Sequence, residues 1–201
     1  MIERTEQGQS DRTWPTIGGA GVESDEGLAA RAAGDADAFA ELYRRYAEPI
    51  RRYCSLRLRD WWVVEDVTSE IFVQALERLH ATSVVSVRPW LFTIAHHRCT
   101  DRYRRHRTEV DLDQGLGLIS DATGPEATAL FNSEVERLRW AIAGLKPDQA
   151  HVIELRLCGL NGPEIRQVLH RSRAWVDTTQ YRALKRLREL LDVESSTEEQ
   201  Q

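Results

Sequence analysis

The segment at residues 88–107 constrains the fold most, because an apolar stripe at helical spacing runs directly into a basic end. The apolar positions, which would face a core, are Trp90, Leu91, Ile94, Ala95 and Cys99. Residues 98–107 then carry five Arg, one Asp and Tyr103. Arginine beside exposed aromatic rings can hold phosphates and stack on unpaired bases, but cations also suit the C-terminal end of any solvated helix. The pattern predicts one long helix and leaves both interpretations of its basic end open.

Helical spacing of apolar residues also governs the segments before this one. It predicts helices between residues 36 and 58, where Pro49 would bend or break the helix, and between residues 64 and 79. Residues 81–87 are too few for another helix and are expected to form a loop. No alternating apolar pattern is strong enough to build a sheet. The expected fold class is all-α, with two small helical domains joined by a flexible acidic linker.

Changes of composition along the chain predict where these domains begin and end. The N-terminal stretch is rich in Gly, Ser, Thr, Glu and Gln and cannot bury enough apolar area to become ordered. Residues 108–136 hold seven acids and no Lys or Arg. The expected parts are a disordered extension (1–34), a helical domain (35–107), an acidic linker (108–132), a second helical domain (133–191) and a disordered acidic tail (192–201).

The composition also narrows the class of protein. No apolar run approaches the ~20 residues of a membrane span. The N-terminus lacks the layout of a signal peptide, so we expect a cytoplasmic protein. Cys54, Cys99 and Cys158 lie far apart and are expected to be small buried residues in a reducing compartment. The net charge of −5 argues against general nucleic-acid binding, but the segregation of acids and bases still allows a local basic patch.

Residues 147–191 have the layout of a helix-turn-helix unit. Asp148 can cap a first helix, and Asn161 followed by Glu164 is a capping-box pattern for a second. A tight turn at residues 170–172 then leads into a longer third helix, which in DNA-binding proteins enters the major groove. An ordinary antiparallel helical bundle fits the same spacing.

Four stretches of the chain, taken in order, carry motifs that occur together in one family. They are residues 37–43 (Asp-Ala-Phe-Ala-Glu-Leu-Tyr), 65–76 (Glu-Asp-Val-Thr-Ser-Glu-Ile-Phe-Val-Gln-Ala-Leu), 88–105 and 145–187. In this order they resemble the opening of region 2, the polymerase-docking helix, the promoter-melting helix and region 4 of bacterial sigma factors. The chain therefore resembles a sigma factor of the sigma-70 family, extracytoplasmic-function (ECF) type.

The resemblance implies a protein that has no reaction and no cofactor of its own. Such a protein binds core RNA polymerase, directs promoter recognition, helps to open the DNA and so initiates transcription. The implied partners are core RNA polymerase, through its β′ coiled coil and β flap, and promoter DNA, with no membrane insertion. Whether an anti-sigma factor also binds is left open.

The acidic residues of the second motif provide the expected polymerase-binding face. Asp66 and Glu70 lie one helical turn apart, so that both carboxylates project from one face toward an arginine-rich partner. The resemblance implies the polymerase-binding set Asp66, Val67, Glu70 and Phe72. Ser69 stands where the family usually has Gln, which would weaken docking. A merely solvated acidic face is the alternative.

The third motif implies the site for the single-stranded −10 element. The loop at residues 82–88 and the helix after it would accept a base flipped from the non-template strand. The implied residues are Arg88, Trp90, His97, Arg98, Arg102, Tyr103, Arg104 and Arg105. Trp90 fits a core position better, since it shares the apolar stripe with Leu91. His97 stands where the family commonly has Asn.

The fourth motif implies −35 contacts but departs most from the family. The implied residues are Arg171, Ser172, Arg173, Trp175, Asp177, Thr178 and Arg182. Trp175 and Asp177 stand where the family has small or basic residues, and His170 replaces a turn Gly. An acid is repelled by phosphate, although Asp can accept a hydrogen bond from cytosine N4. The expected −35 readout is altered, weak or replaced by protein contacts.

Three other functions remain to be weighed against the sigma factor. A helix-turn-helix regulator that acts without polymerase leaves the paired acids unexplained. A sigma-like adaptor without −35 readout is favoured by Trp175 and Asp177. A zinc protein or enzyme would depend on His96, His97, Cys99 and His106. Adjacent helical histidines diverge by about 100°, so four convergent ligands are not expected, and no metal site is predicted.

Overall fold

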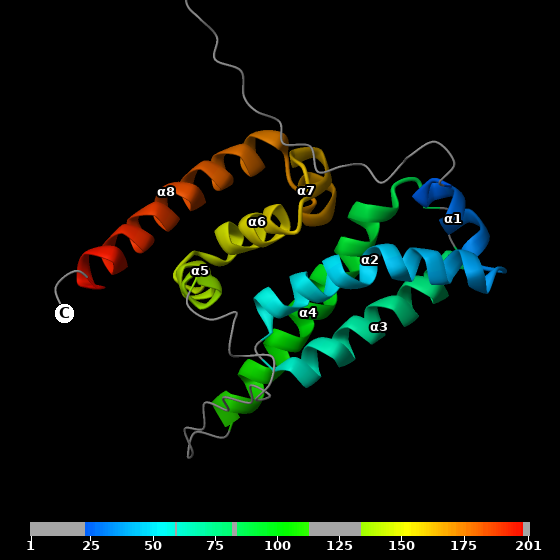
Figure 1. Ribbon diagram of the computed structural model, residues 1–201, viewed down its shortest axis with the longest axis horizontal. Coiled ribbons are helices and arrows are strands. Elements are labelled where there is room, and N and C mark those ends of the chain that lie inside the picture. Colours follow the sequence, from blue (N-terminus) through cyan, green and yellow to red (C-terminus); the bar gives the residue numbers. More distant parts are fainter. Residues whose placement is uncertain (1–22, 59, 82–83, 113–133, 199–201) are drawn as a thin grey trace, which may run out of the picture.

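The structure is a computed structural model that describes residues 23–58, 60–81, 84–112 and 134–198. Within these ranges all regular structure is α-helical (Figure 1). The helices are α1 (Asp25–Ala32), α2 (Ala36–Arg57), α3 (Trp61–Leu79), α4 (Val87–Leu112), α5 (Glu134–Ala143), α6 (Pro147–Leu157), α7 (Gly162–Leu169) and α8 (Arg173–Glu198). The all-α fold class is therefore confirmed. No helix in the described ranges is both long and apolar enough to cross a membrane.

Helices α2, α3 and α4 build the first helical unit on local signals that the sequence carries. The Asp35 carboxylate caps α2 by accepting hydrogen bonds from the backbone N–H groups of residues 37 and 38, at 3.0 and 3.2 Å. Asp60 caps α3 in the same way, accepting from the N–H of Trp62 at 2.8 Å. The predicted stripes of the three helices are buried against one another, with Tyr53, Ile71 and Phe92 at the centre. Periodicity and caps together thus determine this unit.

Pro49 lies inside α2, which continues to Arg57 without a break. A proline in a helix removes one backbone hydrogen bond and crowds the preceding turn, which favours a break. The apolar residues on either side oppose it, because Ile50 and Tyr53 are completely buried. Packing of this face outweighs the local cost, so the helix is not broken at Pro49.

The second helical unit, α5–α8, contains the predicted helix-turn-helix. Asn161 Oδ1 accepts from the Glu164 N–H at 2.9 Å, and Glu164 Oε2 accepts from the Asn161 N–H at 2.7 Å, which confirms the capping box. The α6 start differs slightly from expectation, since the cap position is Lys146 and Asp148 lies in the first turn. His170, between α7 and α8, adopts the left-handed conformation (φ 52°, ψ 46°).

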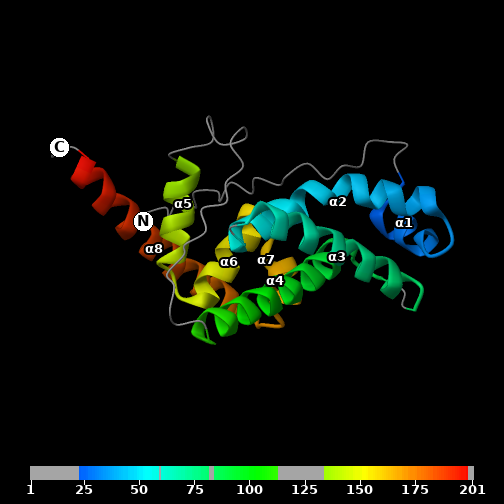
Figure 2. The same cartoon turned by 90° about the horizontal axis from the view of Figure 1, so that it is seen from below.

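The two units are packed against one another in this structure. α7 lies beside α4, and α6 lies beside α2 (Figures 1 and 2). One apolar cluster includes residues of both units, among them Cys54, Phe92, Leu155 and Ile165. A smaller cluster of α5, α6 and α8 includes Ile142, Ile153 and Leu187. The contact between the units is therefore part of the main core.

Three helices extend into segments that were expected to lack structure. α1 lies within the supposed N-terminal extension and buries Leu28, while its Asp25 pairs with Arg45 of α2 at 2.7 Å. This short helix is thus ordered by its tertiary contacts, which cannot be inferred from the composition of the segment. α4 and α8 continue to residues 112 and 198, into the expected linker and tail. Residues 1–22 and 113–133, where the rest of the extension and linker was predicted, lie outside the described residues.

Candidate polymerase and nucleic-acid interface

An acidic face of α3 borders a shallow cavity of about 280 Å³. Its lining residues are Asp66, Ser69, Glu70, Val73, Gln74, Glu77 and Arg98. Asp66 and Glu70 are both exposed, as the helical spacing predicted. Val73 is an apolar residue at the same surface and is 59% exposed. This face can therefore offer three carboxylates and one apolar contact to a basic partner.

Val67 and Phe72 do not belong to this exposed face. Val67 is 2% exposed and Phe72 is 5% exposed. The Phe72 ring packs on that of Tyr43, with ring centroids 4.6 Å apart. They were wrongly grouped with the polymerase-contacting residues, because their α3 positions point into the core. Their role in this structure is to hold α3 against α2.

Arg98, expected on the DNA strand, lies at the edge of the acidic face of α3. Its Nε donates to Gln74 Oε1 at 3.2 Å, and its Nη1 lies 3.7 Å from Glu70 Oε2. The pair is partly exposed, so solvent weakens the attraction between its charges. Arg98 thus orients Glu70 and lowers the net negative charge of the cavity.

The C-terminal half of α4 presents the predicted basic surface. Arg102, Tyr103, Arg104 and Arg105 are all exposed, as is His97 nearer the middle of the helix. The Tyr103 ring is 56% exposed. The exposed ring lies among the arginines, as stacking on unpaired bases requires.

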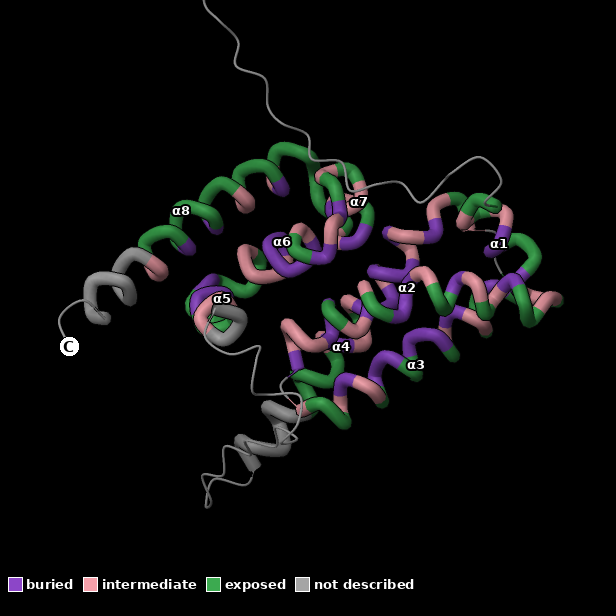
Figure 3. The backbone as a smooth tube through the Cα atoms, in the orientation of Figure 1, coloured by how far each residue is buried: buried purple, intermediate pink, exposed green. Residues whose placement is uncertain are grey.

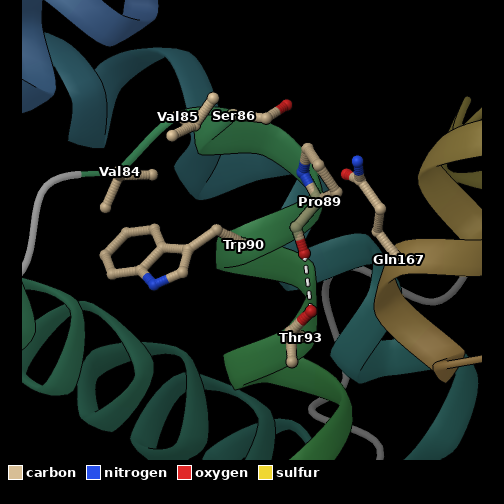
Figure 4. A pocket seen from close by; sticks show the side chains of 7 residues that line it. All are labelled: Val84, Val85, Ser86, Pro89, Trp90, Thr93 and Gln167. Carbon is tan, nitrogen blue, oxygen red and sulfur yellow. Dashed lines mark hydrogen bonds between the residues drawn. The ribbon is translucent and has the colours of Figure 1, made fainter.

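A second cavity, also of about 280 Å³, lies at the N-terminal end of α4 (Figure 4). It is lined by Val84, Val85, Ser86, Pro89, Trp90, Thr93 and Gln167. The Trp90 ring extends toward Val84 and is only partly buried, so it serves both the core and the cavity. Thr93 donates to the Pro89 carbonyl at 2.8 Å (Figure 4). Residues 82 and 83 of the predicted base-accepting loop lie outside the described residues.

Arg88 lies between the two helical units instead of on the outer surface of α4. Its Nη2 donates to the carbonyl of Cys158 at 3.2 Å, and its Nη1 lies 4.0 Å from Glu164 Oε1. Gln167 of α7 borders the cavity at Pro89 from the same side (Figure 4). In this arrangement, α6 and α7 therefore occupy the side of α4 from which Arg88 would reach a strand.

A buried polar cluster holds α6 against α2 and α4. Arg57 Nη1 donates to Glu154 Oε2 at 2.8 Å, with the two side chains only 8% and 7% exposed. The His96 and His151 rings meet edge to face, with centroids 4.8 Å apart. Burial lowers the pKa of His96 to about 3 and that of His151 to about 4. Both imidazoles are therefore neutral at pH 7 and suited to close packing.

The N-terminal part of α8 and the two residues before it present most of the expected −35 residues. Arg171, Ser172, Arg173, Asp177, Thr178 and Arg182 are exposed. Arg173 Nε lies 3.5 Å from Asp177 Oδ2, so the acid that would repel phosphate has a cation beside it. Trp175 is half-buried against the core beneath the Arg171 guanidinium, 5.0 Å from the ring centroid. α8 is exposed along most of its outer side (Figure 3).

Comparison with known proteins decides the family. Residues 42–109 match the family model described as Sigma-70 region 2. The chain is 32% identical over 172 residues to the ECF RNA polymerase sigma factor ShbA of Streptomyces griseus, covering 79% of this chain and 90% of that one. It is 34% identical over 165 residues to the ECF RNA polymerase sigma factor BldN of Streptomyces coelicolor, covering 79% of this chain but only 62% of the relative.

The chain belongs to the ECF sigma factors of RNA polymerase. A solved structure agrees: that of CnrH in complex with the cytosolic domain of CnrY superposes with a TM-score of 0.67. The identity is 26%, and the match covers 85% of this chain and 99% of CnrH. The region 2 match runs from within α2 to within α4, so it includes the basic surface, the acidic-face cavity and the lining of the other cavity except Gln167.

Sequence reasoning missed several residues that this sigma factor uses at its inner contacts. Arg57 and Glu154 are 97 positions apart, and no local pattern links them. Gln167 was not expected near the α4 cavity, because it lies in the other unit. Of the residues considered as metal ligands, His96 packs on His151 and Cys99 is buried, whereas His97 is exposed. Among the described residues, no three His, Cys, Asp or Glu side chains converge on one point.

Proposed function

We propose that this sigma factor docks on core RNA polymerase through the acidic face of α3 and holds the opened −10 strand along α4. The observation that carries the proposal is the presence of both surfaces on one unit, within the segment that matches region 2. One surface has three carboxylates and the other four exposed arginine and tyrosine residues. In this function the protein lends specificity to the polymerase, performs no reaction of its own and works in the cytoplasm.

The acidic face suits a partner surface that is basic and partly apolar. Asp66 and Glu70 offer charge, while the exposed Val73 offers an apolar contact between them and Glu77. In the family such a partner is a coiled coil of the polymerase β′ subunit. Arg98 lies at the rim of this cavity and also on α4, so it connects the docking face to the DNA-holding helix. Docking can thus influence the position of α4.

The cavity at Trp90 is the candidate receptor for a flipped base. Its lining on the first unit is largely apolar, with hydroxyl groups at Ser86 and Thr93, and Gln167 of α7 borders it only while the two units are packed together. Unstacking a base costs a few kcal/mol, which an aromatic ring and hydrogen bonds can return. The basic half of α4 would then bind the adjoining phosphates.

Strand binding requires the two units to move apart from their arrangement in this structure. Arg88 is engaged with Cys158 and Glu164, and Gln167 borders the base cavity. CnrH, which has the same fold, is found in complex with the cytosolic domain of CnrY. We propose that a protein partner of that kind can also hold this chain away from polymerase.

A sigma-like adaptor with little −35 readout is the second candidate function. The observation in its favour is the N-terminal part of α8, where Trp175 packs inward and Asp177 pairs with Arg173. That part of the helix thus presents less free positive charge than a duplex-reading helix ordinarily does. Fluorescence anisotropy with duplex promoter DNA separates the candidates, because an adaptor shows no sequence-specific, salt-dependent binding through α8.

The docking proposal is tested by charge reversal on α3. The double variant D66K/E70K should lose co-purification with core polymerase and lose run-off transcription by more than about tenfold, since two attractions become repulsions. The matched control is E26K, which reverses an exposed acid on α1 of the same unit. Equal polymerase binding by D66K/E70K and E26K would contradict the proposed docking face.

A further inference from the structure

Two cysteines from different helices are in direct contact in the core. The Cys99 thiol of α4 donates to Cys54 Sγ of α2 at 3.6 Å. Both side chains are fully buried, and both are free thiols. A disulfide bond is about 2.05 Å long, so the sulfurs need approach by only about 1.5 Å to form one. The contact therefore places two thiols close to bonding geometry, although 45 residues separate them in sequence.

The two thiols differ in their tendency to ionise. The hydrogen bond from Cys99 lowers the pKa of Cys54, and Thr68 and Arg57 act in the same direction against burial. The pKa of Cys99 is raised well above its ordinary value, because its proton is held by Cys54 and because it is buried. Cys54 is thus the sulfur that becomes a thiolate, the reactive form, while Cys99 keeps its proton.

Two buried donors beside this pair lack an acceptor. Among the described residues, the buried side-chain atoms without a hydrogen-bond partner are Thr68 Oγ1 and Arg57 Nε. Both residues favour the Cys54 thiolate over the thiol. Thr68 is 1% exposed, so its hydroxyl group lies in the interior. An anionic sulfur at Cys54 would give the Thr68 hydroxyl group a negative partner, and the positive charge of Arg57 favours the same anion.

We propose that Cys54 and Cys99 form a redox-active dithiol that a peroxide oxidises to a disulfide between α2 and α4. The Cys54 thiolate attacks one peroxide oxygen and breaks the O–O bond, giving a Cys54 sulfenic acid and a hydroxide that is protonated to water. The Cys99 sulfur then attacks the Cys54 sulfur, and its proton leaves with the departing hydroxide as a second water. Two thiols lose two electrons and two protons, and one peroxide becomes two waters.

The disulfide would act on the contact between the two helical units through Arg57. This side chain bonds Glu154 of α6 and also Thr100, which directly follows Cys99. Cys158, which directly follows α6, lies in the same apolar cluster, and burial raises its pKa to about 12. It is therefore the unreactive third thiol, and the cluster opens to a small oxidant when α6 moves away from α2.

The test uses the reduced full-length chain with the substitution C158S, which keeps the proposed pair and removes the third thiol. The chain is treated with hydrogen peroxide under native conditions, alkylated, digested with trypsin and analysed by mass spectrometry without reduction. The expected product is residues 53–57 joined to residues 99–102, two hydrogen atoms lighter than the separate peptides and released by dithiothreitol. C54S and C99S should each lack this product.

A substitution of Thr68 tests why Cys54 is the reactive sulfur. T68V removes the unpartnered hydroxyl group but keeps the side-chain shape, and circular dichroism checks that the fold is kept. Oxidation should slow roughly threefold, because a smaller fraction of Cys54 would then be thiolate. An unchanged rate would contradict the assignment of the thiolate to Cys54. Thiols that stay alkylatable after peroxide, or that link only in denaturant, would overturn the dithiol proposal.

Discussion

The two helical units of this sigma factor have similar helical construction but differ in how their charged residues are used. In the α2–α4 unit, Asp66 and Arg102 are exposed on separate surfaces, each suited to a partner of opposite charge. In the α5–α8 unit, Asp177 pairs with Arg173, and Glu154 forms a buried ion pair with Arg57 of α2. The first unit therefore exposes the charges that the proposed polymerase and DNA contacts require, while Glu154 of the second unit serves its packing on the first.

Removing Glu154 should have the largest effect on stability. E154A leaves the buried Arg57 guanidinium without its counter-ion, which costs about 3 kcal/mol of unfolding free energy. Urea denaturation measures this change. The matched control is E189A, whose partner Arg186 is exposed and whose loss should cost about 0.5 kcal/mol or less. Equal effects of the two substitutions would show that the units do not dock in solution as they do here.

Removing two arginines from α4 should have the next largest effect, this time on single-stranded DNA. R102A/R105A removes two phosphate contacts, so binding to a labelled −10 strand should weaken by roughly tenfold. The slope of log K against log salt concentration should become shallower by about 1.4. R182A, an exposed arginine of α8, is the control and should leave this affinity unchanged. An equal loss in R182A would mean that both units hold the strand.

The comparison also shows which features local sequence determines. Caps at Asp35 and Asn161 and the stripe of α4 act within a few residues, so they were predictable. The burial of Val67 and Phe72 agrees with the apolar stripe of residues 64–79, whereas it was the family resemblance that grouped them with the polymerase contacts. The Arg57–Glu154 pair and the Cys54–Cys99 contact join distant segments, and only the assembled fold brings them together.

The turn between α7 and α8 tests whether the second unit carries avoidable strain. The left-handed conformation that His170 adopts costs a residue with a side chain roughly 1–2 kcal/mol of conformational free energy, and Gly does not have this cost. H170G should therefore raise the unfolding free energy by about 0.5 kcal/mol after the entropy cost of Gly. H80G at an exposed position with negative φ, the C-cap of α3, is the control and should not stabilise. A loss of stability in H170G would indicate that the imidazole has a compensating contact.

A further small effect is expected on duplex DNA binding at the start of α8. D177N removes a negative charge and frees Arg173, so binding of the full chain to duplex −35 DNA should tighten by about threefold. Fluorescence anisotropy at two salt concentrations measures it. E189Q, which removes a charge farther along the same helix, should have no such effect. Weaker binding by D177N would instead indicate that Asp177 reads a base.

Transcription from reconstituted holoenzyme tests most directly whether this chain directs promoter choice through the acidic face of α3 and the basic surface of α4. Core RNA polymerase, the full-length chain and genomic DNA of the source organism are combined, and the 5′ ends of the transcripts are sequenced. We expect new start sites that share a −10 sequence, that appear only with this chain and that disappear with D66K/E70K. Start sites identical to those of core polymerase alone, under conditions in which the chain is folded, would contradict the proposed function.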